Sequence, residues 1–293
     1  MQLRHASVRA LIEADGTTDD PVVAIRRRAR ELVDEVRAGL GWKGPPFDPS
    51  DIASYRGFKV KSASDGFNQS QDACVTPGLI VLNATKPPKR RRYSVAHEII
   101  HTLFPDYEAE LCRSGALWRS EDDDNELERL CQIGAAELLL PEFSFRPRLE
   151  SLGLNLQVTH QLEVEYDASI EAIVRRSVDV WLEPAAAIFF RPPGSHLPSY
   201  EGYSAYQPIS ASSIHTGSHI WDFRLELGMR PPSGSVVTKA WKRAGTPRVA
   251  SDTYAAEELW SHSRTQAVRC EAMVLPKRSA TPIEVLCLLQ QRA

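Results

Sequence analysis

In the first half of the chain, apolar residues recur mostly at helical spacing. The pattern predicts a charged amphipathic helix over residues 22–40, while residues 1–20 are polar and are expected to be mobile. Further apolar stretches predict a short helix at 51–55, strands at 58–61 and 79–83, and helices at 93–104 and 125–141. In the helix at 93–104, Ser94 is the expected N-cap and Pro105 the stop signal.

The pattern changes twice further along the chain. Residues 151–183 are mainly helical, with one helix over 154–166 and a second one capped by Ser169. From Pro184 onward strands dominate, and they are predicted at 185–191, 220–227, 236–241, 267–275 and 282–290. The chain is therefore predicted to be an α+β protein with a domain at 1–150, a helical extension at 151–183 and a mixed α/β domain at 184–293.

The most specific chemical signal is the pentapeptide His97-Glu98-Ile99-Ile100-His101, an HExxH pattern in the middle of a predicted helix. Positions i and i+4 lie on one helix face, about 6 Å apart along the axis, so the two imidazoles can bind one zinc ion. Glu98 can then reach a water molecule bound to the metal. The alternative is a buried helix whose histidines only hydrogen-bond to their neighbours.

A catalytic zinc ion usually takes three protein ligands, and the helix at 125–141 is the best source of the third. Glu128 shares a helix face with small and apolar residues, where a carboxylate is costly unless a metal ion compensates its charge. Glu126 and Glu137 fall on the opposite side. Gln132, one turn after Glu128, is expected to hold a ligand in place. The alternative for Glu128 is an ordinary acid on a helix that is apolar all round.

Two segments resemble a known family. Arg90–Glu98 (RRRYSVAHE) is similar to the lead-in of ImmA/IrrE-type metallopeptidases, in which basic, aromatic and hydroxyl residues precede Ala-His-Glu. Glu128–Pro141 resembles the second signature of that family, a glutamate ligand on a helix that ends in a Leu-rich run and proline. The chain departs from the family at Ile100, where glycine is common, at Gln132, where asparagine is usual, and at Gly134, where an aromatic residue is usual.

The resemblance implies a zincin-like metallopeptidase domain with one zinc ion per chain, held by His97, His101 and Glu128, and with Glu98 as the catalytic base. It also implies an intracellular peptidase that cuts a helix-turn-helix repressor and so switches on a stress-response, DNA-damage or anti-phage operon. The domain at 184–293 occupies the position of a GAF-like sensor domain in the family, and a small molecule or single-stranded DNA is its expected activator.

Composition restricts the remaining choices. A length of 293 residues and a hydrophobic content of 42% are enough for two domains with sizeable cores. The net charge of −3 excludes electrostatic nucleic-acid binding by the whole chain. Residues 86–92 (KPPKRRR) are the most basic stretch, and they are either a solvated loop at the start of a helix or a contact for an acidic substrate or nucleic acid. No apolar run is long enough to span a membrane and the five cysteines form no paired pattern, so we expect a soluble, cytoplasmic protein with no membrane partner.

Cys112 lies between the two ligand helices, eleven positions after His101 and sixteen before Glu128. A thiolate is a good zinc ligand, and a loop tethered to both helices can bring it to the open coordination position. Cys112 is therefore a candidate inhibitory fourth ligand that displaces the water nucleophile. The alternative is a small buried or half-exposed cysteine.

Two further patterns suggest nucleic-acid binding. Residues 154–181 mimic a helix-turn-helix, with Arg175 and Arg176 at the recognition positions, so the alternative function is a DNA-binding regulator with a structural or vestigial zinc site. In the last domain a basic set with one aromatic residue is a candidate contact for single-stranded nucleic acid; its members are Lys239, Trp241, Lys242, Arg243 and Arg248. A surface strand with a basic edge explains the second pattern equally well.

Overall fold

The computed structural model describes residues 5–67, 71–108, 124–192, 209–217, 225–242, 250–255, 267–275 and 284–291. The chain divides into two compact units. Unit 1 comprises Met1–Phe145 and Gln161–Ala172, and unit 2 comprises Arg146–His160 and Ile173–Ala293. The boundary runs through the predicted helical extension, so this extension contributes residues to both units. Helices and sheets occur in both units, which confirms the α+β class.

The sheet of unit 1 has the strand order β1-β3-β2, where β1 is Lys59–Ala63, β2 is Ala73–Thr76 and β3 is Leu79–Asn83. β1 pairs with β3 in parallel and β2 pairs with β3 in antiparallel, with Val75 opposite Ile80. The strand β2 was not predicted from the sequence, because four residues are too few for a clear alternation. β3 is the central strand, and β2 lies at an edge.

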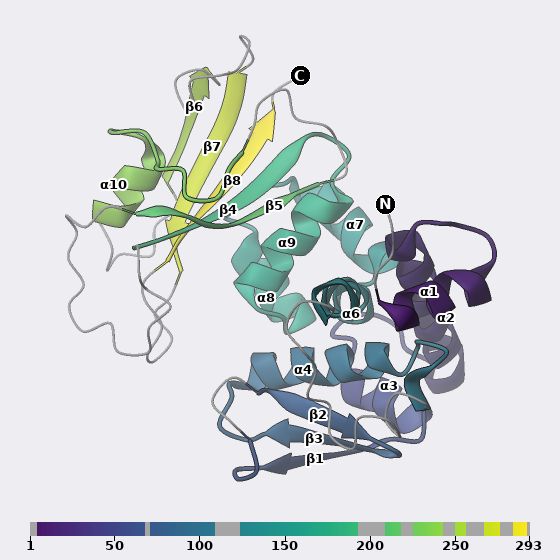
Figure 1. The fold of residues 1–293 in the computed structure, drawn as a ribbon. Helices are drawn as coiled ribbons and strands as arrows, with labels where there is room; N and C mark the ends of the chain where they lie inside the picture. Colours follow the sequence, from purple (N-terminus) through teal and green to yellow (C-terminus); the bar gives the residue numbers. More distant parts are fainter. Residues whose placement is uncertain are drawn as a thin grey trace. The chain divides into compact units, whose positions relative to one another are not determined.

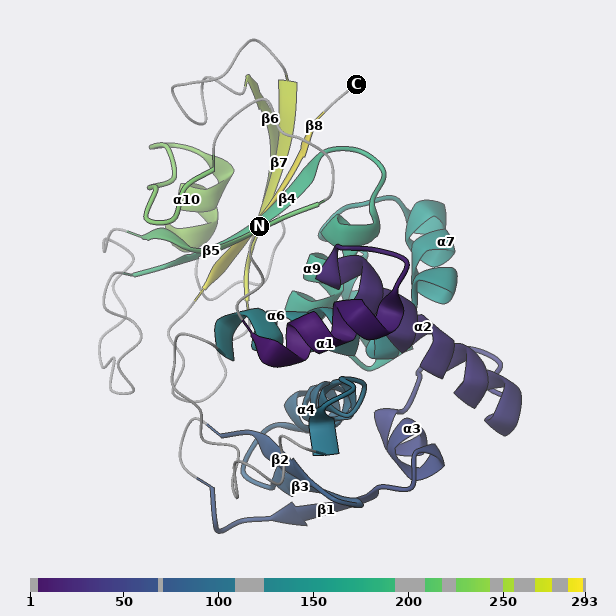
Figure 2. The same ribbon diagram turned by 45° about the vertical axis from the view of Figure 1, so that its right-hand side comes forward.

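Helix α4 (Pro88–His101) packs on one face of this sheet (Figures 1 and 2). Helix α6 (Asp124–Leu139) packs against α4. The predicted cap at Ser94 is wrong: Ser94 is a buried residue inside α4, and its hydroxyl donates a hydrogen bond to the carbonyl of Arg90. The helix begins six residues earlier because Pro88 is tolerated in the first turn, where its missing N–H costs nothing.

The basic run at 86–92 therefore leads into and forms the start of α4, and acidic residues of unit 1 neutralise it. Lys86 and Arg90 both pair with Asp72, at 3.0 Å and 2.6 Å. Lys89 pairs with Glu163 at 2.9 Å, and Arg92 pairs with Asp167 at 3.0 Å. These charges hold the helix start in place, which leaves less positive charge for an acidic partner than the sequence suggested.

Residues 5–20 are ordered, contrary to the expectation of a mobile segment, and residues 1–4 lie outside the described residues. Helix α1 (Ala6–Asp15) buries Val8 and Leu11 completely. It is followed by α2 (Pro21–Leu40), capped by Asp20, and by α3 (Pro49–Tyr55), capped by Asp48. Only two core positions in ten residues made α1 look polar in the sequence.

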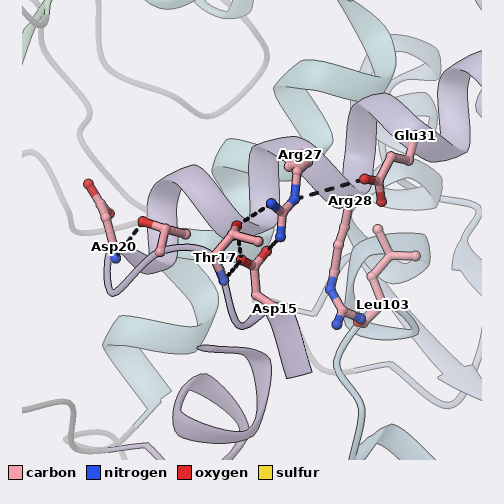
Figure 3. Close-up of polar contacts among 8 residues, drawn as sticks. Asp15, Thr17, Asp20, Arg27, Arg28, Glu31 and Leu103 are labelled. Atoms are coloured by element: carbon pink, nitrogen blue, oxygen red, sulfur yellow. Dashed lines mark hydrogen bonds and ion pairs between the residues drawn. The ribbon is translucent and has the colours of Figure 1, made fainter. Parts of the chain in front are cut away.

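Two arginines of α2 connect it to its surroundings (Figure 3). Arg27 pairs with Asp15 and Thr17 at the end of α1, and so closes the corner between the first two helices. Arg28 donates a hydrogen bond of 3.0 Å to the carbonyl of Leu103, two residues after α4 ends. The second contact satisfies a carbonyl beyond the end of the helix and fixes the C-terminal end of α4.

Unit 2 contains a five-stranded antiparallel sheet with the order β5-β4-β8-β7-β6. Its strands are β4 (Ala185–Arg191), β5 (Ser210–Thr216), β6 (Ala250–Ala255), β7 (Ala267–Val274) and β8 (Val285–Gln291). The strands predicted at 185–191 and 267–275 are confirmed, and the strand predicted at 282–290 is confirmed over residues 285–290, while residues 282 and 283 lie outside the described residues. Of the strand predicted at 220–227, residues 220–224 lie outside the described residues, and residues 225–227 are not extended.

The strand predicted at 236–241 is wrong, because this segment is the helix α10 (Val236–Lys242), which packs on one face of the sheet of unit 2 (Figure 1). Val236, Val237, Ala240 and Trp241 point into the core, at positions i, i+1, i+4 and i+5. The apolar pattern of these seven residues fits the period of a strand as well as that of a helix. The segment is a helix because its apolar residues then pack on the sheet.

The other face of the sheet contacts two residues of the same unit, Leu156 in a loop and Arg175 in a helix. Glu271 accepts a hydrogen bond of 2.6 Å from the backbone N–H of Leu156. The guanidinium of Arg175 lies over the ring of Phe189, 4.7 Å from its centroid, and donates to the hydroxyl of Ser213 at 2.9 Å. Arg176 is 2% exposed and pairs with Asp179 at 2.8 Å.

Both arginines at the would-be recognition positions are thus engaged inside unit 2. Helix α9 (Ile170–Val180, capped by Ser169) exists as predicted, and helix α8 (Thr159–Tyr166) begins five residues later than the predicted span of 154–166. Packing explains the pattern of both helices. Helix α7 (Glu142–Leu152) precedes them. None of the helices in the described ranges is long and apolar enough to cross a membrane.

Candidate metal centre

The centre is built where α4 and α6 face each other. On α4 the facing residues are His97, Ile100 and His101, and on α6 they are Glu128, Cys131 and Gly134. Ile100 and His101 follow His97 by three and four residues, and Glu128, Cys131 and Gly134 follow one another by three, so each set lies on one helix face. The contact therefore brings together residues that are about 30 positions apart in the sequence.

Three potential ligands converge at this contact. The two Nε2 atoms of His97 and His101 lie 3.2 Å apart. The carboxylate of Glu128 reaches both rings, with Oε2 at 3.1 Å from Nε2 of His97 and Oε1 at 3.5 Å from Nε2 of His101. Donors bonded to tetrahedral zinc at about 2.0–2.1 Å are separated by about 3.3–3.4 Å, so the three side chains fit a zinc ion.

A second set of metal-type residues overlaps the first. Donor atoms of His97, His101 and Cys131 also lie within 4.8 Å of one another. However, the sulfur of Cys131 contacts Nδ1 of His101, at 3.5 Å, whereas Glu128 is on the Nε2 side of the same ring. One imidazole presents one nitrogen to a given metal ion, and only Glu128 reaches the Nε2 atoms of both histidines. We therefore favour His97, His101 and Glu128 as the ligand set.

Glu98 has the burial and charge environment of a general base. It is 8% exposed, and burial is the main reason why its pKa rises from 4.5 to about 7; the charges of Glu128 and Asp72 also raise it, while His97 opposes them. Burial alone lowers the pKa of His97, but the hydrogen bond with Glu128 and the charges of Glu98 and Glu128 raise it above its ordinary value. A base with a pKa near neutrality is well matched to proton transfer at physiological pH.

The raised pKa of Glu98 predicts a pH-dependent stability of the zinc-free protein. A carboxyl group with a higher pKa in the folded state contributes stability below about pH 4.5, and this stability is lost as the pH rises through about 7. In zinc-free protein, Glu98→Gln should therefore increase the free energy of unfolding at pH 8 by on the order of 3 kcal/mol, and far less at pH 5. Urea unfolding of both proteins across this range measures the difference; a gap that does not change with pH would contradict the burial of a charged Glu98.

The structure does not bring the other predicted site residues to the centre. Gln132 is exposed, and no hydrogen bond from it to a ligand occurs among the described residues, because its position on α6 turns it away from α4. Cys112 lies outside the described residues, and its role as an inhibitory ligand stays a prediction. Glu126 and Glu137 face other partners, as expected: Glu126 accepts from the N–H of His5, and Glu137 pairs with Arg30 at 3.3 Å.

Trp241, the aromatic residue of the predicted nucleic-acid set of unit 2, is not available for base stacking. Trp241 is 3% exposed and packs in the core under the sheet, so its ring cannot stack on a base. Lys239 and Lys242 are exposed on α10, and Arg243 and Arg248 lie outside the described residues. Two exposed lysines on one short helix are what remains of the pattern.

Two residues near the centre were not singled out from the sequence. Tyr107 follows α4, and its hydroxyl is buried without a hydrogen-bond partner among the described residues; burial raises its pKa to about 12, and the charge of Glu98 adds to this. A hydroxyl that stays protonated can donate a hydrogen bond. Asp72 is the second one, as the partner of Arg90. Neither residue belongs to a sequence motif, so their proximity to the centre could be identified only from the structure.

The departures from the family pattern at Ile100 and Gly134 are in contact with each other. A Cβ atom on Gly134 would lie 2.7 Å from Cδ1 and 2.9 Å from Cγ1 and Cγ2 of Ile100, which is completely buried. The branched side chain on α4 thus occupies the space that a larger residue on α6 would need. The missing side chain at Gly134 compensates for the added one at Ile100, and the distance between the ligand helices is kept.

This compensation predicts a change of sign in a double-mutant cycle. Gly134→Ala should destabilise the protein by about 1–3 kcal/mol, because Ile100 and the helix behind it must shift. In an Ile100→Ala background the same substitution should stabilise by up to about 1 kcal/mol, since only the higher helix propensity of alanine remains. Thermal or urea unfolding of the four proteins gives the coupling. Equal effects in both backgrounds would show that the two side chains do not compete for space.

Comparisons with known proteins agree with this centre. Residues 56–177 match the family model described as the IrrE N-terminal-like domain, Peptidase_M78. The chain is 28% identical over 140 residues to the radiation response metalloprotease IrrE of Deinococcus radiodurans. That match covers 47% of this chain and only 40% of the length of the relative.

A solved structure extends the similarity to the whole chain. The structure described as a Mycobacterium tuberculosis transcriptional regulator superposes with a TM-score of 0.61 and covers 99% of this chain and 81% of its own. Its sequence identity is 12%, so it shows a shared fold and no more. The matched segment 56–177 contains β1 to β3, α4 and α6, together with all three converging ligands. This segment, which is less than half of the chain, is similar to the IrrE N-terminal-like domain of ImmA/IrrE-type peptidases.

Proposed function

We propose that the protein is a zinc-dependent endopeptidase that cleaves a transcriptional repressor in response to a signal. The observation that carries the proposal is the convergence of His97, His101 and Glu128, with the buried Glu98 adjacent on α4. His97, His101 and Glu128 would hold the zinc ion. When bound, zinc lowers the pKa of its water to about 7 and polarises the carbonyl of the scissile bond.

The remaining chemistry belongs to residues of the chain. Glu98 accepts a proton from the attacking water and delivers it to the nitrogen of the leaving amine. In the zinc-free protein the pKa of Glu98 is about 7, and a nearby cation lowers it, so the carboxylate form prevails at neutral pH. Proton transfer in both directions requires that Glu98 is held near the metal ligands, which its place directly after His97 on α4 provides.

The edge of the unit 1 sheet supports binding of an extended peptide. β3 is flanked by β1 and β2 and offers no unpaired backbone edge, whereas β2 pairs only with β3 among the described strands. Cys74 of β2 lies close to Glu98: burial raises the pKa of its thiol most, and the charge of Glu98 raises it further. A substrate segment added along β2 would pass beside the catalytic base.

The identity of the substrate and the signal rests on the family resemblance. A helix-turn-helix repressor is the proposed substrate, and cleavage would relieve repression of a stress, DNA-damage or anti-phage operon. Unit 2 is the proposed sensor, in a GAF-like role, for a small molecule or single-stranded DNA. Its five-stranded antiparallel sheet, with α10 on one face, supports a separately folded module that mostly follows the peptidase unit in the sequence.

The alternative function, a DNA-binding regulator, required Arg175 and Arg176 to be available for contacts with DNA, and both have partners within unit 2. Arg176 is buried in an ion pair, and Arg175 lies against Phe189 and Ser213. The description of the mycobacterial structure as a regulator applies to that protein, and at 12% identity it does not transfer a DNA-binding role.

The proposal is tested by sequencing the genes that flank this one, and by incubating the zinc-loaded full chain with any helix-turn-helix protein that they encode, with and without single-stranded DNA. We expect cleavage at a defined bond that a chelator abolishes and Glu98→Gln prevents. Mass spectrometry of the products locates the bond. A full chain that contains stoichiometric zinc and cleaves neither this protein nor unfolded casein under any of these conditions would refute the peptidase function.

A further inference from the structure

Cys131 lies against one of the two zinc-binding histidines. It is completely buried on α6, three residues after Glu128, and its sulfur is 3.5 Å from Nδ1 of His101. The opposite nitrogen of the same ring, Nε2, faces His97 and Glu128. The imidazole of His101 is therefore contacted on both nitrogens by residues that come from α4 and α6.

We propose that Cys131 is a positioning residue that holds His101 in the orientation and tautomer that bind zinc. This inference rests on the zinc site of the proposed function. A neutral imidazole carries its proton on one nitrogen, and a partner that accepts a hydrogen bond at Nδ1 leaves the lone pair of Nε2 for the metal. The sulfur of Cys131 is the acceptor in this arrangement, and Nδ1–H of His101 is the donor.

His97 lacks this support. Its Nδ1 is buried and has no hydrogen-bond partner among the described residues. The ring of Tyr93 is its aromatic neighbour on α4, at 6.2 Å between centroids, and supplies packing without a directed bond. Cys131 is thus the residue in the described part of the site that directs the second nitrogen of a zinc-binding histidine.

The expected change in zinc affinity depends on how strong an acceptor the sulfur of Cys131 is. Partners that orient a metal-binding histidine typically change metal affinity about 10–100-fold, and most of them are carboxylates or carbonyls. A thiol sulfur is a weaker acceptor than either. The loss of Cys131 should therefore lie at the lower end of this range, at about 10-fold.

Direct ligation by Cys131 is the competing role, and it requires a different geometry. The sulfur would have to bind a metal ion on the Nδ1 side of His101, away from the two carboxylate oxygens of Glu128. Cobalt distinguishes the two roles, because a thiolate bound to Co²⁺ gives an intense sulfur-to-metal charge-transfer band and a hydrogen-bonded thiol does not.

The experiment measures Zn²⁺ affinity by competition with a chromophoric chelator for the full chain and for Cys131→Ala and Cys131→Ser. Both substitutions are small, and alanine favours the helix, so α6 is retained. A hydroxyl accepts a hydrogen bond as the thiol does, while it packs less well in an apolar environment than a methyl group. A hydrogen-bonding role and a packing role therefore predict opposite orders for the two variants.

We expect Cys131→Ala to bind Zn²⁺ about 10-fold more weakly than the unchanged chain, and Cys131→Ser to lie between the two. The cobalt form of the unchanged chain should show no thiolate band. Equal affinities in the three proteins, a weaker affinity for Cys131→Ser than for Cys131→Ala, or a thiolate band that disappears in Cys131→Ser would each overturn the proposal. Because these readouts are independent of cleavage, a protein without peptidase activity would still report on Cys131.

Discussion

Glu98→Gln is expected to lower the rate of peptide cleavage about 10²–10⁴-fold while the zinc content of the protein stays unchanged. The amide has the size of the carboxylate but cannot accept the proton of the attacking water. Glu98 is buried beside His97 and is not one of the three converging ligands, so its replacement removes the base without removing a donor from the metal.

The measurement combines metal analysis with single-turnover cleavage of the same protein preparation. Glu137→Gln is a matched control, because Glu137 is also a buried glutamate of unit 1 but pairs with Arg30, away from the centre. The control should keep the cleavage rate within a few-fold, even where it lowers the unfolding temperature. Cleavage by Glu98→Gln at the rate of the unchanged chain would refute the assignment of Glu98 as the base.

Glu128→Ala is expected to weaken zinc binding by more than about 100-fold, which exceeds the cost of losing an orienting partner. The carboxylate approaches both Nε2 atoms, so its removal deletes the third donor and the negative charge that offsets the metal. Loss of zinc should in turn abolish the proposed cleavage.

Glu126→Ala is the control, since Glu126 lies on the same helix two residues earlier and contacts the backbone of His5. It should retain zinc within a few-fold of the unchanged chain. Chelator competition measures both variants. If Glu128→Ala kept its zinc while Cys131→Ala lost it, the ligand set would be His97, His101 and Cys131 in place of the one favoured by the geometry.

The parts of the fold that could be predicted are those with a strong local pattern. The helix α2 has nineteen of its twenty residues in the predicted span, and the strands β3 and β4 are continuous apolar runs up to their last residue. The elements that were missed or misassigned are short: α1 has two buried apolar positions in its helix, β2 has four residues, and α10 has seven. For such segments the neighbouring elements decide the structure, because local propensity is too weak to do so.

The sequence alone predicted the chemistry of the centre. The spacing of His97 and His101 places both imidazoles on one helix face, and the same periodicity separates Glu128 from Glu126 and Glu137, because helix periodicity is a local property of the chain. The cost of burying a lone carboxylate, which was the other argument for Glu128, does not apply, because its side chain is 44% exposed.

Only the tertiary structure decided which side chains meet across the two helices. It placed Cys131, and not Gln132, against His101, and it showed that Ile100 and Gly134 share one volume. It also buried Trp241 and Arg176, which removes the aromatic member of the C-terminal basic set and one of the two recognition arginines, while Lys239 and Lys242 stay exposed. The physical reason is the same in each case: a neighbour in space is set by the packing of whole elements, and the rotation of a helix by one residue moves a side chain by 100° to a different partner.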